Sequence, residues 1–340
     1  MDDVRRAVGH VLDQLGLGPI ETPSRVAWSA PAMRLHAYQD PQANQPVLLM
    51  VPAPIKRGYL WDLSPRTSAV RQCLRGGIQV HRIDWNRPTN AQQNLALADH
   101  ADQFIDASIA AIEKETGQKQ VFLTGHSLGG TLAAIYTSLH PDRVRGLILI
   151  QSPVHFSKDT GALEWLVDLS PPAQCLTPLL GNAPGSFLSL AAYQASPATY
   201  EISRLLDWLF SLFDPQAMQT HLRVQRWTLD ESPMAMRLFE QVVEWLYREN
   251  RFMRGMLNIN GQTASPQAIT SPILAITNRH CQVVPPESVL PFLQASSSRE
   301  TQVLWYGGDT GVALQHVGAL VGRSAHQTLW PQIVQWIRTH

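Results

Sequence analysis

Short apolar runs alternate with amphipathic segments along the first part of the chain. The apolar runs have the length of buried strands, and the amphipathic segments repeat their apolar residues every three or four positions, as helices do. The pattern predicts helices at residues 1–16, 68–74, 97–115 and 131–139, and strands at residues 34–38, 45–52, 78–85, 120–124 and 146–150. Because helices and strands alternate and most strands are apolar throughout, we expect a doubly wound, mostly parallel α/β sheet.

This alternation is interrupted after about residue 156. The following segments have helical periodicity and are rich in Trp, Phe, Met and Leu, which is typical of a helical insertion. Two more strands and a closing helix come after it, at residues 273–277, 301–306 and 324–337. The chain is therefore expected to divide into the first part of the core with the N-terminal helix, a helical cap and the second part of the core, at residues 1–156, 157–270 and 271–340.

Composition and charge exclude several classes of protein. The chain has 340 residues, 44% of them hydrophobic, and can bury a large core. Lys and Arg balance Asp and Glu at 27 each, so no net charge attracts a nucleic acid. No run has the roughly 18 apolar residues of a membrane span, and the N-terminus lacks a signal peptide's apolar stretch, so a cytoplasmic location is expected. Cys73, Cys175 and Cys281 lie far apart, and neither a disulfide framework, a metal site nor a cofactor is expected.

A Gly-x-Ser-x-Gly motif directly follows an apolar strand and opens a helix. It is formed by Gly125, Ser127 and Gly129. A serine hydroxyl is a weak nucleophile until a base takes its proton and donors stabilise the oxyanion, and a sharp strand-to-helix turn presents the hydroxyl to both. Ser127 is therefore the candidate nucleophile, with a purely structural turn as the alternative. The N–H of Leu128, at the start of the helix, is the expected oxyanion donor.

The loop after the strand at residues 45–52 is expected to supply a second oxyanion donor. Pro52 and Pro54 have no N–H group, so Ala53 and Ile55 are the candidates.

The base is expected to be a histidine that follows the last strand. His316 lies in a glycine-rich segment after the strand at 301–306 and is the candidate. His280, His326 and His340 are interpreted as surface or packing residues. His126, next to the serine, is expected to line the entrance and to point away from the serine hydroxyl.

Several stretches of the chain together resemble a known family. They cover almost the whole chain from about residue 25 and lie at residues 34–38, 49–63, 77–85, 125–130, 139–145, 152–156, 227–230, 283–286 and 316–318. In these stretches the chain is similar to the catalytic subunit of the class III polyhydroxyalkanoate synthases. The resemblance implies an α/β-hydrolase fold with a cap inserted after the sixth core strand. It also implies a reaction that joins hydroxyacyl groups from hydroxyacyl-CoA into a polyester held on a cysteine, with a second subunit as partner.

The nucleophile departs from the pattern of that family. Ser127 stands where the family has its cysteine. A thiolate is both a good nucleophile and a good leaving group for repeated thioester exchange, whereas a serine ester is a common hydrolytic intermediate. The change favours hydrolysis over chain growth.

The acid that orients the histidine is also replaced. Cys281 stands at the family's acidic position, and His155 stands where the family usually has another Asp. Asp309, shortly before His316, is a candidate replacement. Asp159 or Glu164, or the absence of any acid, are the alternatives.

These residues support three hypotheses. The first is a serine α/β-hydrolase that cleaves or transfers hydroxyacyl esters or thioesters through a Ser127 acyl-enzyme. The second is a polyhydroxyalkanoate synthase that uses hydroxyacyl-CoA. The third is a non-catalytic paralogue that acts as a synthase or granule partner. The expected ligand is an acyl ester or acyl-CoA, and a homo-oligomer or a second synthase-like subunit is the expected protein partner.

Overall fold

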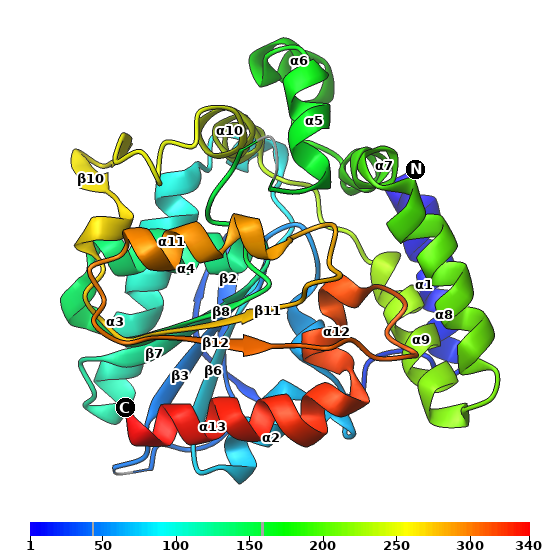
Figure 1. Ribbon diagram of the computed structural model, residues 1–340, viewed down its shortest axis with the longest axis horizontal. Coiled ribbons are helices and arrows are strands. Elements are labelled where there is room, and N and C mark those ends of the chain that lie inside the picture. Colours follow the sequence, from blue (N-terminus) through cyan, green and yellow to red (C-terminus); the bar gives the residue numbers. More distant parts are fainter. Residues whose placement is uncertain (43, 158–159) are drawn as a thin grey trace.

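One eight-stranded sheet forms the centre of the molecule in a computed structural model that describes residues 1–42, 44–157 and 160–340 (Figure 1). Its strands are β1 Arg25–Ala30, β2 Met33–Ala37, β3 Val47–Val51, β6 Gln79–Trp85, β7 Val121–His126, β8 Val144–Ile150, β11 Ile273–Thr277 and β12 Thr301–Trp305. They follow the order β1-β2-β6-β3-β7-β8-β11-β12. β2 pairs antiparallel with β1 and β6, and all other neighbours pair parallel. The predicted mostly parallel sheet is confirmed.

Helices cover both faces of this sheet. On one face lie α2 (Ala69–Arg75), α12 (Gln315–Val321) and α13 (Trp330–Thr339), and on the other α3 (Phe104–Thr116), α4 (Leu128–Leu139) and α11 (Leu290–Ala295) (Figure 1). Successive side chains of a strand point to opposite faces. In β3, Leu49 therefore joins one core, whereas Leu48 and Met50 join the other. Both cores need apolar residues from the same strand, which explains its continuous apolar run.

A helical cap is inserted after β8, the sixth strand of the sheet along the chain. Its helices are α5 Ala162–Leu169, α6 Ala173–Leu180, α7 Gly185–Ala195, η5 Ala198–Ser203, α8 Arg204–Ser211, α9 Pro215–Thr228, α10 Met236–Gln241 and η6 Val242–Arg248. A hairpin of β9 (Leu257–Ile259) and β10 (Gln262–Ala264) then leads back to the sheet. The insertion leaves the sheet at the carboxyl end of β8, and its residues line a cavity together with Ser127 at the carboxyl end of β7, so the cap lies over this edge of the sheet.

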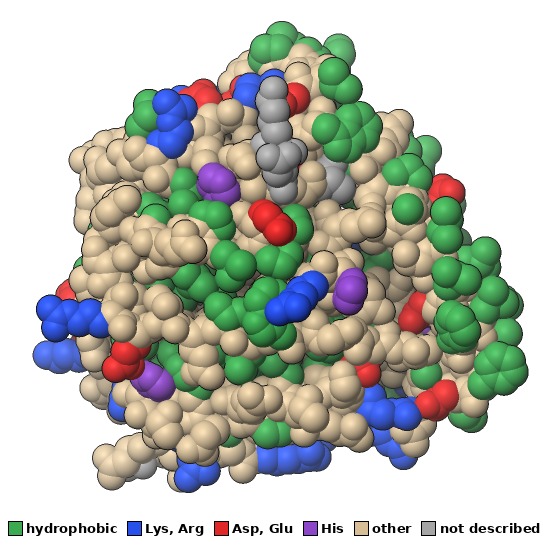
Figure 2. Space-filling model, in the orientation of Figure 1, with side chains coloured by type: hydrophobic (Ala, Val, Ile, Leu, Met, Phe, Trp, Pro, Cys, Tyr) green, Lys and Arg blue, Asp and Glu red, His purple; other side chains and the backbone are tan. Residues whose placement is uncertain are grey.

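The N-terminal helix α1 (Asp2–Gln14) packs against the cap rather than against the sheet. Arg226 of α9 donates to both carboxylate oxygens of Asp13, at 2.7 and 2.6 Å. Apolar side chains stay exposed around α8 and gather at the right edge in Figure 2. They are Ile202, Leu205, Leu206, Trp208, Leu209, Phe210, Leu212 and Phe213.

Three local features differ from the sequence prediction. The edge strand β1 was not predicted, because its exposed residues interrupt the apolar pattern. The helix expected from residue 131 begins at Leu128, directly after the serine. The segment expected to be a glycine-rich loop around His316 contains the short helix α12. No helix among the described residues is both long and apolar enough to cross a bilayer.

Candidate active site

Ser127 is the single residue that connects β7 to α4, and its backbone conformation is strained. Its φ is 54° and its ψ is −135°, a combination that a non-glycine residue rarely adopts. The surrounding glycines make this turn sterically feasible. A Cβ added to Gly125 would overlap the Gly129 backbone, and one added to Gly129 would overlap the Val51 carbonyl. The turn therefore fixes the serine at the end of a buried strand, as a nucleophile elbow does.

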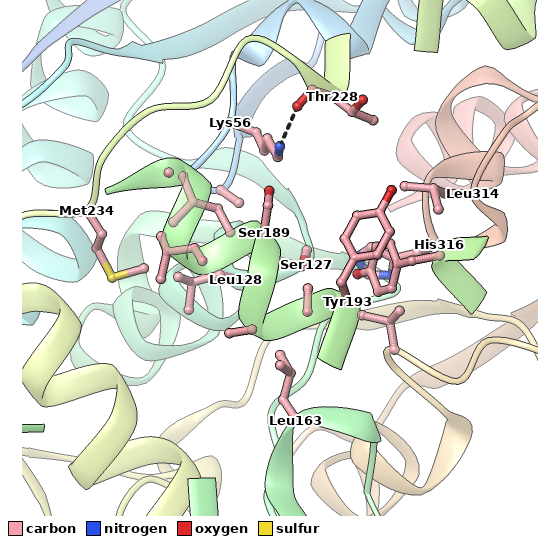
Figure 3. A pocket seen from close by; sticks show the side chains of 18 of the residues that line it. Lys56, Ser127, Leu128, Leu163, Ser189, Tyr193, Thr228, Met234, Leu314 and His316 are labelled. Carbon is pink, nitrogen blue, oxygen red and sulfur yellow. Dashed lines mark hydrogen bonds between the residues drawn. The ribbon is translucent and has the colours of Figure 1, made fainter. Parts of the chain in front are cut away.

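A cavity of about 730 Å³ lies above Ser127, between the sheet and the cap. Ser127, Leu128 and His316 line it together with the cap residues Leu163 and Tyr193 (Figure 3). Most of the other lining side chains are apolar, including Leu12, Leu60, Leu166, Phe187, Leu188, Val243 and Val284. A largely apolar wall suits an acyl chain.

The predicted oxyanion donors lie at the same cavity. Ala53 and Ile55 line it from the loop after β3, opposite Leu128 at the start of α4. Within the described residues, the N–H groups of Ala53 and Leu128 donate to no other group. The Ile55 carbonyl accepts from the Ser232 N–H at 3.2 Å, which fixes this loop to the cap. Free N–H groups at a helix start and a neighbouring loop are what an oxyanion requires.

His316 enters the cavity from the first turn of α12. Burial, and secondarily the neighbouring His126, hold the pKa of His316 well below its ordinary value of 6.5. The rings of His126 and His316 are 4.7 Å apart, and His126 Nε2 donates to the His316 carbonyl at 2.8 Å. His126 is thus buried against His316, and both residues line the cavity. The neutral imidazole of His316 has the protonation state of a base.

A carboxylate from the cap holds the loop that leads to His316. Asp207 of α8 accepts from the N–H groups of Gly311 and Ala313, both at 2.8 Å. Ala313 has a φ of 60°, so this loop needs such support. The sequence offered no signal for Asp207, because the contact joins residues about one hundred positions apart.

Cys281 is the side chain beside the ring nitrogen of His316 that faces away from the cavity. Its Sγ lies 3.7 Å from His316 Nδ1. Burial raises the pKa of the Cys281 thiol to about 11, so the thiol is neutral at pH 7. The thiol therefore lies beside Nδ1 of His316, where a Ser-His-Asp triad has its carboxylate.

The structure does not bring Asp309 to His316. The Asp309 carboxylate accepts from Tyr306 Oη at 2.8 Å, from the Ser324 N–H at 2.9 Å and from Ser324 Oγ at 2.6 Å. These donors hold the carboxylate against Tyr306 and Ser324 rather than against the imidazole of His316. Its expected role as the orienting acid is corrected accordingly: the carboxylate fixes the loop after β12.

The other candidate acids are also accounted for. Glu164 is buried and accepts from Thr160 Oγ1 at 3.0 Å, and burial raises its pKa. Asp159 lies outside the described residues. His155 contacts Asn250, with 3.1 Å between His155 Nδ1 and Asn250 Nδ2. Within the described chain, no carboxylate forms a hydrogen bond or ion pair with His316.

A charged cluster on the cavity wall was missed in the sequence. Lys56 Nζ donates to the Thr228 carbonyl at 3.1 Å (Figure 3) and to Glu231 Oε1 at 3.0 Å. Arg5 donates to the same two groups, both at 3.1 Å. Ser189 also donates to Glu231, whose side chain is 1% exposed. Burial lowers the pKa of Lys56. The position of Lys56, in the loop that follows a buried strand, was the one feature of the sequence that could have indicated this cluster.

A family model described as "alpha/beta hydrolase fold" matches residues 46–308. Among curated proteins, the poly(3-hydroxyalkanoate) polymerase subunit PhaC of Haloferax mediterranei is 28% identical over 320 residues, which cover 93% of this chain and 64% of that protein. PhaC of Allochromatium vinosum is 28% identical over 347 residues and is covered to 95%, with 99% of this chain matched. The chain thus spans less than two thirds of the first relative and nearly all of the second.

Solved structures share the fold at low sequence identity. A monoacylglycerol lipase from Paleococcus ferrophilus superposes with a TM-score of 0.58 and 16% identity, over 90% of this chain and 99% of that one. The thioesterase domain from the curacin biosynthetic pathway superposes with a TM-score of 0.52 and 13% identity, over 94% and 99%. The chain belongs to the alpha/beta hydrolase fold family, and over most of its length it is similar to poly(3-hydroxyalkanoate) polymerase subunits.

Proposed function

We propose that the protein is a serine acyl-transfer enzyme that cleaves or transfers hydroxyacyl esters or thioesters. The observation that carries this proposal is the strained elbow of Ser127 at the base of an apolar cavity that His316 also lines. A positive φ at a non-glycine residue is retained where the surrounding structure enforces it, and such strain gathers at functional sites.

The proposed reaction has two stages. Ser127 Oγ attacks the acyl carbonyl carbon while His316 Nε2 takes the hydroxyl proton, and the Leu128 N–H with that of Ala53 or Ile55 stabilises the oxyanion. His316 then gives the proton to the leaving thiol or alcohol as the tetrahedral intermediate collapses. In the second stage, water or a hydroxyl attacks the acyl-enzyme, with His316 again taking the proton.

The proposed acyl group is a hydroxyacyl chain. Similarity to proteins named poly(3-hydroxyalkanoate) polymerase supports this choice, and the apolar cavity is compatible with it. A serine at the elbow favours water as the second acceptor, because a serine ester lacks the leaving ability that repeated exchange on a thiol provides. A polymerase that uses hydroxyacyl-CoA, with a second copy or a second subunit as partner, is the alternative that the relatives' names favour.

Labelling of Ser127 is the first test. The purified protein is treated with a fluorophosphonate probe, and the labelled serine is identified by mass spectrometry. We expect labelling that Ser127→Ala abolishes and that Ser297→Ala, at an exposed serine, leaves unchanged. A folded protein that is not labelled would favour the non-catalytic paralogue as a synthase or granule partner.

The acceptor is identified with 3-hydroxybutyryl-CoA. Release of CoA is followed with a thiol reagent, and the acyl product is analysed by mass spectrometry. We expect free hydroxy acid. Oligomers would instead support the polymerase, and absence of turnover by a protein that the probe still labels would reject this acyl-CoA as the substrate.

A further inference from the structure

The charged residues that line the cavity are all basic. Among the described residues they are Arg5, Lys56, Arg57 and Arg204. No described Asp or Glu lines the cavity. Arg57 is neutralised by Asp84, to which it donates at 3.1 Å. The wall around Ser127 is therefore biased toward positive charge, and an uncharged acyl ester makes no use of this bias.

The two sides of the cavity differ in polarity. In Figure 3, Lys56 and Thr228 lie on one side of Ser127, and Leu163 lies on the other. The side of Leu163 is formed by α5 and η6, which pack together and contribute Leu166, Val167, Val242 and Val243. The side of Lys56 is completed by α1, α7 and α9, which contribute Arg5, Ser189 and Gln225. An acyl chain suits the apolar side, so the other side is left for a polar part of the substrate.

Two cations on the polar side share a single carboxylate. Lys56 Nζ and Arg5 Nη2 both donate to Oε1 of Glu231. One negative charge thus faces two positive charges, and the cluster around Glu231 keeps an excess of one positive charge. Arg5 does not lose its proton in a folded protein, so this excess is permanent. An uncompensated charge in a partly desolvated wall is unfavourable until an anion binds beside it.

The neighbouring carboxylates have partners of their own. Asp230 pairs with Arg87 at 2.9 Å and with Arg226 at 3.5 Å, and Arg226 also pairs with Asp13 at 2.6 Å. Asp2 caps the start of α7 through two backbone N–H groups, both at 3.0 Å. These carboxylates are matched, so the excess positive charge stays in the cluster around Glu231.

Both cations of the cluster keep donors for a further anion. An ammonium has three N–H donors and a guanidinium has five. Lys56 uses two of its donors, on Glu231 and on the Thr228 carbonyl. Arg5 makes the same two contacts through Nη2 alone, and neither its Nε nor its Nη1 forms a hydrogen bond with a described residue. A carboxylate in the cavity is therefore able to accept from both side chains at once.

We propose that the cluster around Glu231 binds a carboxylate of the substrate, and that the protein therefore prefers linear hydroxyacid esters with a free carboxyl end. This proposal rests on the proposed function and deepens it, because it names the class of ester. One carboxylate supplies the single negative charge that the cluster lacks, whereas a phosphate brings nearly two. An anion beside Lys56 also favours its charged ammonium, which opposes the effect of burial on its pKa.

In this orientation the carboxylate belongs to the leaving group. Ser127 Oγ bonds to the ester carbonyl carbon, the bond from that carbon to the ester oxygen breaks, and His316 gives this oxygen the proton taken from Ser127. The leaving hydroxy acid keeps its ionised carboxylate at Lys56 and Arg5, while the acyl chain stays on Ser127 at the apolar side. Water then attacks the acyl-enzyme and releases a second hydroxy acid.

Binding without turnover tests this proposal. Isothermal titration calorimetry on Ser127→Ala compares the linear dimer of 3-hydroxybutyrate with the methyl ester of that dimer, which carries no charge. We expect the free acid to bind roughly ten- to a hundredfold more tightly, because it forms hydrogen bonds to charged groups. Lys56→Met and Arg5→Gln, each added to Ser127→Ala, should remove most of this preference. Lys119→Met, the same change at an exposed lysine before β7, should keep it.

The preference is a ratio measured within each variant, so a change in the folded fraction does not alter it. Equal affinities of Ser127→Ala for the two ligands, no binding of the acid at millimolar concentration, or a preference that survives in both Lys56→Met and Arg5→Gln would overturn the proposal. Free coenzyme A tests a phosphate as the anion. If the two substitutions weaken binding of coenzyme A but not of the acid, the cluster is a phosphate site and the proposed carboxylate is wrong.

The proposed function is judged separately from this binding site. Calorimetry on Ser127→Ala involves no chemistry, whereas the fluorophosphonate reports on Ser127 as a nucleophile. A wild-type protein that is not labelled, but whose Ser127→Ala variant prefers the acid, would reject the proposed function and retain the carboxylate site. Labelling of Ser127 without any preference for the acid would do the reverse.

Discussion

At the scale of the residue, the attacking atom of residue 127, oxygen or sulfur, is expected to decide between hydrolysis and polymer formation. Ser127 occupies a turn in which Gly125 and Gly129 leave no room for a side chain. The turn therefore constrains the backbone of the nucleophile, but it does not restrict its functional atom to oxygen. A thiol at residue 127 would lie in the same strained conformation and face the same cavity.

Ser127→Cys is expected to raise the ratio of polymer to free hydroxy acid. A thioester is both formed and displaced more readily than a serine ester, so a second hydroxyacyl group competes better with water. The ratio is measured by mass spectrometry after incubation with 3-hydroxybutyryl-CoA, with Ser127→Ala as the inactive control. An unchanged ratio would mean that the acceptor is set elsewhere in the cavity.

Asp309→Asn is expected to lower stability without affecting acylation. The carboxylate accepts from Tyr306 and from two groups of Ser324, and the amide is able to replace only part of these contacts. We expect a loss of about 1–3 kcal/mol in urea unfolding, with a labelling rate within about threefold of the wild type. Asp40→Asn, at a side chain that is 92% exposed, is the control. A loss of labelling on the order of 10²-fold would return Asp309 to the role of orienting acid.

At the scale of the element, the cluster around Glu231 joins three separate parts of the chain. Arg5 belongs to α1, Lys56 to the loop after β3, and Glu231 to the segment after α9. The backbones of Lys56 and Glu231 also form an isolated antiparallel bridge. One buried carboxylate therefore fixes the N-terminal helix and the cap relative to the loop that carries the oxyanion donors.

Glu231→Gln is expected to destabilise the protein by about 1–3 kcal/mol. The neutral amide leaves Lys56 and Arg5 close together without a counter-charge. Their side chains are 21% and 30% exposed, so solvent screens part of this cost. Denaturant unfolding measures the change, with Glu201→Gln as a control on the exposed side of the cap. Wild-type stability in Glu231→Gln would mean that the cap is held by apolar packing alone.

The elements that could be predicted are those defined by local pattern. β3, β8 and β11 are mostly apolar because both faces of each strand are covered, and the sequence therefore predicted them closely. β1 was missed because an edge strand exposes alternate polar residues. Ser127 and His316 were identified from motif and order along the chain. The contacts of Asp207 and Glu231 were not, since they depend on how the cap folds back over the sheet.

At the scale of the whole molecule, buried histidines make stability depend on pH. Burial lowers the pKa values of His81, His126 and His326 from 6.5 to about 4, and it also lowers those of His100 and His316. His81, His126 and His326 are therefore neutral in the folded protein at pH 5, whereas in the unfolded chain they are protonated below about pH 6.5. The unfolded state therefore binds more protons between these values. Stability is fully present above pH 6.5 and is lost as the pH falls toward 4.

We expect the free energy of unfolding to fall by on the order of 1–2 kcal/mol per buried histidine between about pH 7.5 and about pH 5. His326→Gln provides the matched comparison, because glutamine is able to keep the donation to the Leu320 carbonyl but does not titrate. Urea unfolding at both pH values should show a smaller loss in this variant than in the wild type. Equal losses would assign the pH dependence to other groups. Labelling of Ser127 per folded molecule should persist below pH 6.5, because burial holds the pKa of His316 well below that ordinary value.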